Sequence, residues 1–135
     1  MTKRFFPKAA QLLIALVLLQ AAWYLLRAGM ALRFWETLNQ YQPRGGALYL
    51  FISGAAWGVA GVFTGAALWL RKAWAWGAAT GYFLAAELWF WFDRLALQQA
   101  HANNLFVLVL HISILSLLAL LLFSPTVRNF YHGRR

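Results

Sequence analysis

Glu87 lies inside the apolar run from 73 to 92, where it has less access to water than any other charged residue of the chain. A carboxylate at lipid depth needs a proton or a partner. His111 lies in another apolar run, from 105 to 123, and imidazole exchanges protons near neutral pH. The two residues predict either a proton or cation site whose pKa is tuned by burial, or a structural contact between two helices.

Three further charged residues are expected near Glu87 and His111. Arg94 follows Glu87 by seven positions and so lies on roughly the same helix face, while Arg27 could approach from the first helix. Asp93 directly follows the aromatic run from 89 to 92, which places Asp93 and Arg94 at the level of the lipid headgroups. The sequence therefore predicts an intramembrane polar cluster of Arg27, Glu87, Asp93, Arg94 and His111.

His111 is also a candidate axial ligand for the iron of a haem or the magnesium of a chlorophyll. A hydrogen bond to Glu87 or to a backbone carbonyl is the simpler interpretation, because His101 and His132 are expected in a loop and in the tail. We therefore expect no cofactor. The sequence has no cysteine, nucleotide-binding loop, zinc-protease helix motif or serine elbow, so we expect no enzyme activity.

The composition indicates which solvent surrounds these residues. Of the 135 residues, 63% are hydrophobic and only 11% are charged, which is too apolar for a soluble domain of this size. The net charge is +9, but the basic residues flank the apolar runs instead of sharing one face. We therefore expect anionic lipid headgroups as the counter-charge, and no nucleic acid.

Four apolar segments predict an all-α integral membrane bundle of four transmembrane helices, in a single domain from 1 to 135. The expected spans are about 9–28, 47–70, 73–95 and 105–124. The first resembles a signal peptide, but its apolar run continues past the expected cleavage zone, so we expect it to remain uncleaved. An amphipathic segment from 30 to 40 could form a short interfacial helix.

The orientation follows from the distribution of basic residues, which favours the cytoplasmic side. Eight lie on the side of both termini: Lys3, Arg4, Lys8, Arg71, Lys72, Arg128, Arg134 and Arg135. Four lie on the other side: Arg27, Arg33, Arg44 and Arg94. We therefore expect a multi-pass protein of the cell membrane with cytoplasmic N- and C-termini, and a basic tail after Pro125 that contacts lipid.

Two stripes of small residues predict close helix packing. The second span carries one stripe of glycines: Gly54, Gly58, Gly61 and Gly65. The third span carries a stripe at four-residue spacing: Ala73, Gly77, Gly81 and Ala85. Because only a short connection joins the two spans, we expect the stripes to face each other in a hairpin. Alternatively, either stripe could bind another subunit.

Two functions remain open from the sequence. Small size, small-residue faces and the lack of a catalytic constellation favour an accessory, structural or assembly subunit of a larger membrane complex, with lipids and other subunits as partners. The alternative is a small transporter or channel, acting as a homo-oligomer, that uses Glu87 as an intramembrane proton or cation site.

Overall fold

A computed structural model of the protein describes residues 6–41, 45–97 and 103–132. Within these ranges every regular element is helical, which confirms the all-α prediction. The elements are α1 (Lys8–Arg33), α2 (Trp35–Tyr41), α3 (Gly46–Trp69), α4 (Ala75–Phe92), the π-helical turn η1 (Asp93–Leu97), α5 (Asn104–Leu122) and α6 (Pro125–His132).

Three of these helices, α1, α3 and α5, are long and apolar enough to cross a membrane. The fourth long helix, α4, is shorter at 18 residues and runs directly into η1. Large apolar side chains such as Leu19, Phe63 and Leu120 are mostly exposed on the outside of the helices. Such a surface suits lipid as the surrounding solvent and identifies a membrane protein.

The connection between α1 and α3 contains the short helix that the sequence pattern allowed. α1 continues through Gly29 to Arg33, beyond the expected end of the first span, and only Phe34 separates it from α2. The side chain of Asn39 in α2 accepts a hydrogen bond from the backbone N–H of Ala47, at 2.9 Å. α2 therefore satisfies one of the free N–H groups at the start of α3.

The glycine stripe of α3 packs against α1, which differs from the expected hairpin with α4. A Cβ atom on Gly54 would lie 2.7 Å from the carbonyl oxygen of Tyr24 and 2.9 Å from the nitrogen of Ala28, both in α1. Gly58 and Gly65 likewise face α1, at Leu25 and at Leu18 respectively. Gly61 faces Ala21 of α1 and the Tyr82 hydroxyl of α4. The close backbone contact in this fold is thus between α1 and α3.

The small-residue stripe of α4 has no such partner. A Cβ atom on Gly77 or Gly81 would meet nothing within 4 Å among the described residues. Ala73 and Ala85, which complete the stripe, are exposed as well. α4 instead turns Ala79, Phe83 and other residues of its opposite face into the core.

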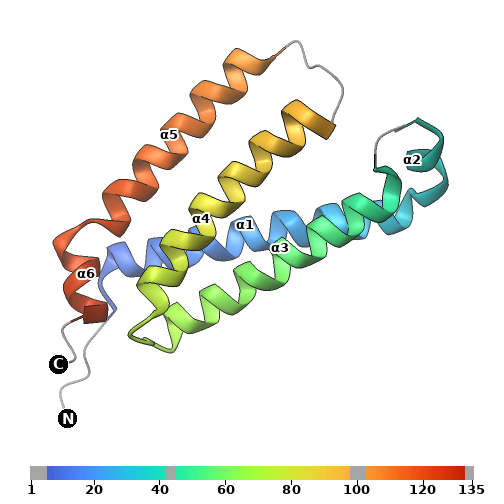
Figure 1. Cartoon of the computed structure of the whole chain (residues 1–135). Helices are drawn as coiled ribbons and strands as arrows, with labels where there is room; N and C mark the ends of the chain where they lie inside the picture. The colour runs from blue at the N-terminus through green and yellow to red at the C-terminus, as the bar shows by residue number, and fades with distance from the viewer. Residues whose placement is uncertain (1–5, 42–44, 98–102, 133–135) are drawn as a thin grey trace.

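The last described helix, α6, closes the end of the molecule that also holds the start of α1 and the turn between α3 and α4 (Figure 1). Tyr131 is buried there and donates a hydrogen bond to the carbonyl of Leu68, at 3.0 Å. Burial raises the pKa of the Tyr131 phenol to about 12 and so extends to higher pH the range in which the hydroxyl can donate this bond. The segment after Pro125, expected to be a tail on the lipid surface, is therefore partly a packed helix.

Arg71 holds the same end together through its guanidinium group. The group lies 4.1 Å from the ring centre of Phe6 and 5.0 Å from that of Phe130. These cation–π contacts link the chain before α1, the α3–α4 turn and α6. Towards the opposite end, α4 and α5 separate from the α1–α3 pair (Figure 1).

Candidate functional site

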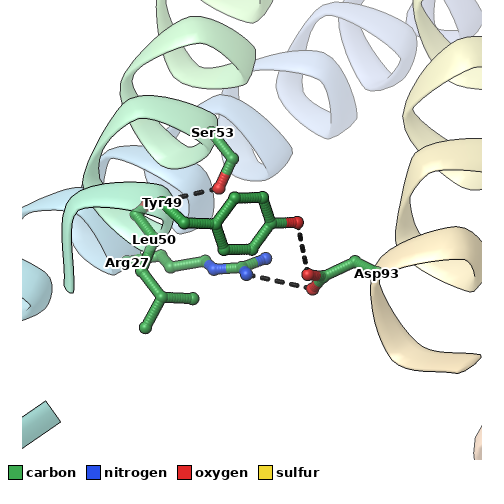
Figure 2. Close-up of polar contacts among 5 residues, drawn as sticks. All are labelled: Arg27, Tyr49, Leu50, Ser53 and Asp93. Atoms are coloured by element: carbon green, nitrogen blue, oxygen red, sulfur yellow. Dashed lines mark hydrogen bonds and ion pairs between the residues drawn. The ribbon is translucent and has the colours of Figure 1, made fainter. Parts of the chain in front are cut away.

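An ion pair bridges the separated helices near the end of the molecule that is opposite α6. Arg27 of α1 donates from Nη2 to Oδ2 of Asp93 at 3.0 Å, and the Tyr49 hydroxyl of α3 donates to Oδ1 of the same carboxylate (Figure 2). Asp93 is fully buried, whereas the Arg27 side chain is 21% exposed. Both carboxylate oxygens thus have partners, as a buried charge requires.

Asp93 is buried, and its proximity to Arg27 agrees with the polar cluster expected from the sequence. It follows the buried residues Ala79 and Ala86 at seven-residue spacing and begins the π-helical turn η1 directly after α4. The helical periodicity of α4 therefore places Asp93 on the face that is turned towards α1 and α3.

Glu87 and His111 form a second, separate pair between α4 and α5. Nδ1 of His111 lies 2.7 Å from Oε1 of Glu87, and Trp91 donates its indole N–H to the same oxygen at 2.9 Å. The imidazole ring stacks on Phe90, with 4.1 Å between the ring centres. Because Oε1 accepts the indole proton, the geometry suits an ionised carboxylate with a proton on Nδ1 of His111.

Arg94 does not join either pair, so the predicted five-residue cluster is divided into three groups. Its guanidinium group donates to the side-chain oxygens of Asn103 and Asn104, at 2.9 and 3.1 Å. Arg94 therefore ties η1 to the beginning of α5. Arg94 follows Glu87 by seven residues and lies within η1, but its guanidinium group contacts the start of α5 and not Glu87.

A cavity of about 630 Å³ lies between α1, α4 and α5. Arg27 from the first pair and both Glu87 and His111 from the second line it. Its polar lining consists of Gln20, Tyr24, Arg27, Glu87 and His111. The remaining lining is apolar or aromatic: Leu16, Leu19, Ala22, Trp23, Leu26, Ala86, Phe90 and Ile114. The volume is in the usual range for a small-molecule site, and the mixture of many apolar groups with a few polar ones is typical of one.

Three residues of this region had no assigned role in the sequence analysis. Tyr49 binds Asp93, and Trp91 binds Glu87. The third is Gln20, whose buried Oε1 has no hydrogen-bond partner among the described residues. A polar residue near the middle of an apolar run was the signal that could have singled out Gln20.

The site does not resemble a metal centre in the part of the chain that the structure describes, where no three His, Cys, Asp or Glu residues gather. His111 uses Nδ1 for Glu87, so Nε2 is its available atom for an axial bond to iron. Comparison of the chain with known protein families, curated proteins and solved structures found no match. The function therefore has to be argued from this geometry.

Proposed function

We propose that the protein is a four-span accessory or assembly subunit of a larger membrane complex, and that α4 presents its small-residue stripe to a helix of the partner. The observation that carries this proposal is the exposure of Gly77 and Gly81, which have no neighbour within 4 Å among the described residues. The glycines of α3 are already used within the chain, against α1.

The direction of the helices supports four spans instead of three. α3 and α5 both run towards the end that holds α6 (Figure 1). α4, which lies between them in the sequence, runs in the opposite direction. If α3 and α5 cross the membrane in the same direction, α4 has to cross it in return. With η1, helical structure continues from 75 to 97, which is enough for a span of about 30 Å. The excess of basic residues on the side of the termini then supports a cytoplasmic position for both of them.

Association between helices in lipid depends on close packing, because lipid tails are as apolar as the side chains. A stripe of glycine and alanine lets two backbones approach and brings many atoms into van der Waals contact. The outward face of α4 offers such a stripe without any rearrangement of the chain. This face supports a docked partner helix better than α5, whose outward residues are large.

The docking face is tested by Gly81→Leu. The added side chain points away from this chain, so the variant is expected to fold with an unchanged melting temperature. It is expected to lose its partner, because the leucine keeps the two backbones apart. Gly29→Leu is the matched control: Gly29 is exposed, has nothing within 4 Å among the described residues, and lies on α1. The measurement is native mass spectrometry after purification in mild detergent.

A heterologous subunit that remains with the wild type and Gly29→Leu but is absent from Gly81→Leu would support the proposal. A subunit retained by all three proteins would show that the α4 stripe is not the docking face. Purification of the wild type alone, or only with copies of itself, would overturn the accessory role and favour the second candidate below.

The second candidate is a small transporter or channel, and it is favoured by the position of Glu87 on the wall of an open cavity with His111 beside it. If Glu87 carries the proton or cation, Glu87→Gln is expected to abolish coupled uptake into vesicles, since an amide cannot bind and release the ion. Glu36→Gln makes the same change of charge at an exposed residue of α2 and should leave uptake intact. Equal uptake by both variants would remove Glu87 from the mechanism.

A further inference from the structure

The cavity between α1, α4 and α5 is accessible from outside the helices. Three of its lining residues on α1 are largely exposed, with Leu19 at 69%, Trp23 at 68% and Leu26 at 58%. The lining on α1 includes Gln20, near the middle of this helix, and the lining on α5 includes His111 and Ile114, near the middle of that one. In a membrane-embedded chain, the opening therefore lies at the depth of the lipid tails.

The charged groups on the cavity wall already have partners within the chain. Arg27 is paired with Asp93, and Oε1 of Glu87 accepts the indole proton of Trp91 and contacts Nδ1 of His111. A phosphate or ammonium headgroup would therefore have to compete with these partners. A neutral head is the chemistry that this wall fits, because burying an uncompensated charge is costly.

The wall nevertheless offers hydrogen-bonding atoms that have no partner among the described residues. The clearest is Oε1 of Gln20, which is buried and without a hydrogen bond. His111 also lines the cavity, and with its proton on Nδ1, where the ring contacts Glu87, it offers Nε2 as an acceptor. An unsatisfied buried polar atom costs free energy, so a ligand that supplies its missing partner gains affinity.

The aromatic residues of the wall favour a flat ring. Trp23, Tyr24 and Phe90 line the cavity together with the imidazole of His111, which stacks on Phe90. Aromatic side chains attract planar groups through offset and edge-to-face contacts. The aliphatic lining at Leu16, Leu19 and Ile114 suits an alkyl or isoprenoid chain.

We infer that the cavity binds a neutral, lipid-soluble ring compound of the quinol class, with its hydroxyl groups donating to Oε1 of Gln20 and Nε2 of His111 and its tail directed to the lipid. The inference goes beyond the proposed subunit role and rests on it in one respect, the embedding of the chain in lipid. No oxidation or reduction is implied, only binding. The exposed stripe of α4 lies outside the cavity, so docking and ligand binding are separable.

The test is binding of decylbenzoquinol, kept reduced under anaerobic conditions, to the full chain in phosphatidylcholine nanodiscs, measured by equilibrium dialysis with empty nanodiscs as the background. Wild type is expected to show saturable binding above that background. Gln20→Leu removes the uncommitted amide and is expected to weaken binding roughly tenfold, the effect of about one hydrogen bond. Gln11→Leu, the same change on α1 outside the cavity lining, should bind like wild type.

The folding of the variants is followed by their melting temperatures. Gln20→Leu should be at least as stable as wild type, because it removes a buried acceptor that lacks a partner. Should it fail to fold, Ile114→Trp replaces it: this residue is 45% exposed, and the larger ring is expected to fill the cavity and abolish binding. Absence of saturable binding to wild type, or equal binding by wild type and the folded cavity variant, would overturn the inference whatever the outcome for Gly81→Leu.

Discussion

Gly54→Ala is expected to lower the free energy of unfolding by about 2–3 kcal/mol, although it adds a single methyl group. The new Cβ would lie 2.7 Å from the carbonyl oxygen of Tyr24 and 2.9 Å from the nitrogen of Ala28. Both are backbone atoms, so no change of rotamer can relieve the contact, and α1 and α3 have to move apart. The measurement is thermal unfolding in mild detergent, followed by tryptophan fluorescence, with a fall in melting temperature of roughly 10 °C.

The matched control is Gly81→Ala, the same substitution within another transmembrane stripe. Its Cβ meets nothing within 4 Å among the described residues, and alanine favours the helix over glycine by about 1 kcal/mol. The control should therefore be as stable as wild type or slightly more stable. Equal melting temperatures for Gly54→Ala and Gly81→Ala would contradict the packing of α1 on the glycine stripe of α3.

Asp93→Asn is expected to cost about 3 kcal/mol, because it leaves the guanidinium group of Arg27 without its carboxylate. The amide is close to the carboxylate in shape, and its oxygen can still accept the hydrogen bond from Tyr49, so the variant removes the charge and the acceptor that faces Arg27. We take the lower end of the usual range for a broken buried pair because the Arg27 side chain is 21% exposed and keeps some hydration. Thermal unfolding in mild detergent measures the loss.

Glu36→Gln controls for the change in net charge, since Glu36 is exposed on α2. Glu36→Gln should have the same melting temperature as the wild type. The double variant Arg27→Gln with Asp93→Asn removes both charges and is expected to be more stable than the sum of the two single changes predicts. Additive losses in the double variant would mean that the ion pair contributes nothing to the stability of the fold.

Hydropathy was sufficient to predict the helical class, because α1, α3 and α5 are each dominated by their long apolar runs. Helical periodicity also identified which residues of α3 lie on one tightly packed face. Periodicity could not identify the partner of that face, because a glycine stripe indicates that another helix packs closely but does not indicate which one. The short α3–α4 turn made α4 the natural choice, whereas the contacts of Gly54 and Gly58 are with α1.

The contacts of the polar residues could also be predicted only in part. Glu87 and His111 could be singled out because both interrupt apolar runs, and the structure places them in contact. Asp93 was expected in one polar cluster with Arg27, and the structure pairs these two residues. Tyr49 gave no sign of its bond to Asp93, since tyrosine near the end of a span is equally expected at the interface. Sequence distance hides such pairs until the helices are placed in space.

The bond between Arg27 and Asp93 also constrains how the chain is made. Its two residues are 66 positions apart, so at about 5–20 residues per second the ribosome adds Asp93 roughly 3–13 s after Arg27. During that interval α1 and then α3 are completed and can pack across the glycines of α3, but the guanidinium group has no carboxylate. Water, headgroups or the insertion machinery have to solvate it until Asp93 has been added. The link between α1 and the end of α4 can therefore form only after most of the protein has been synthesised.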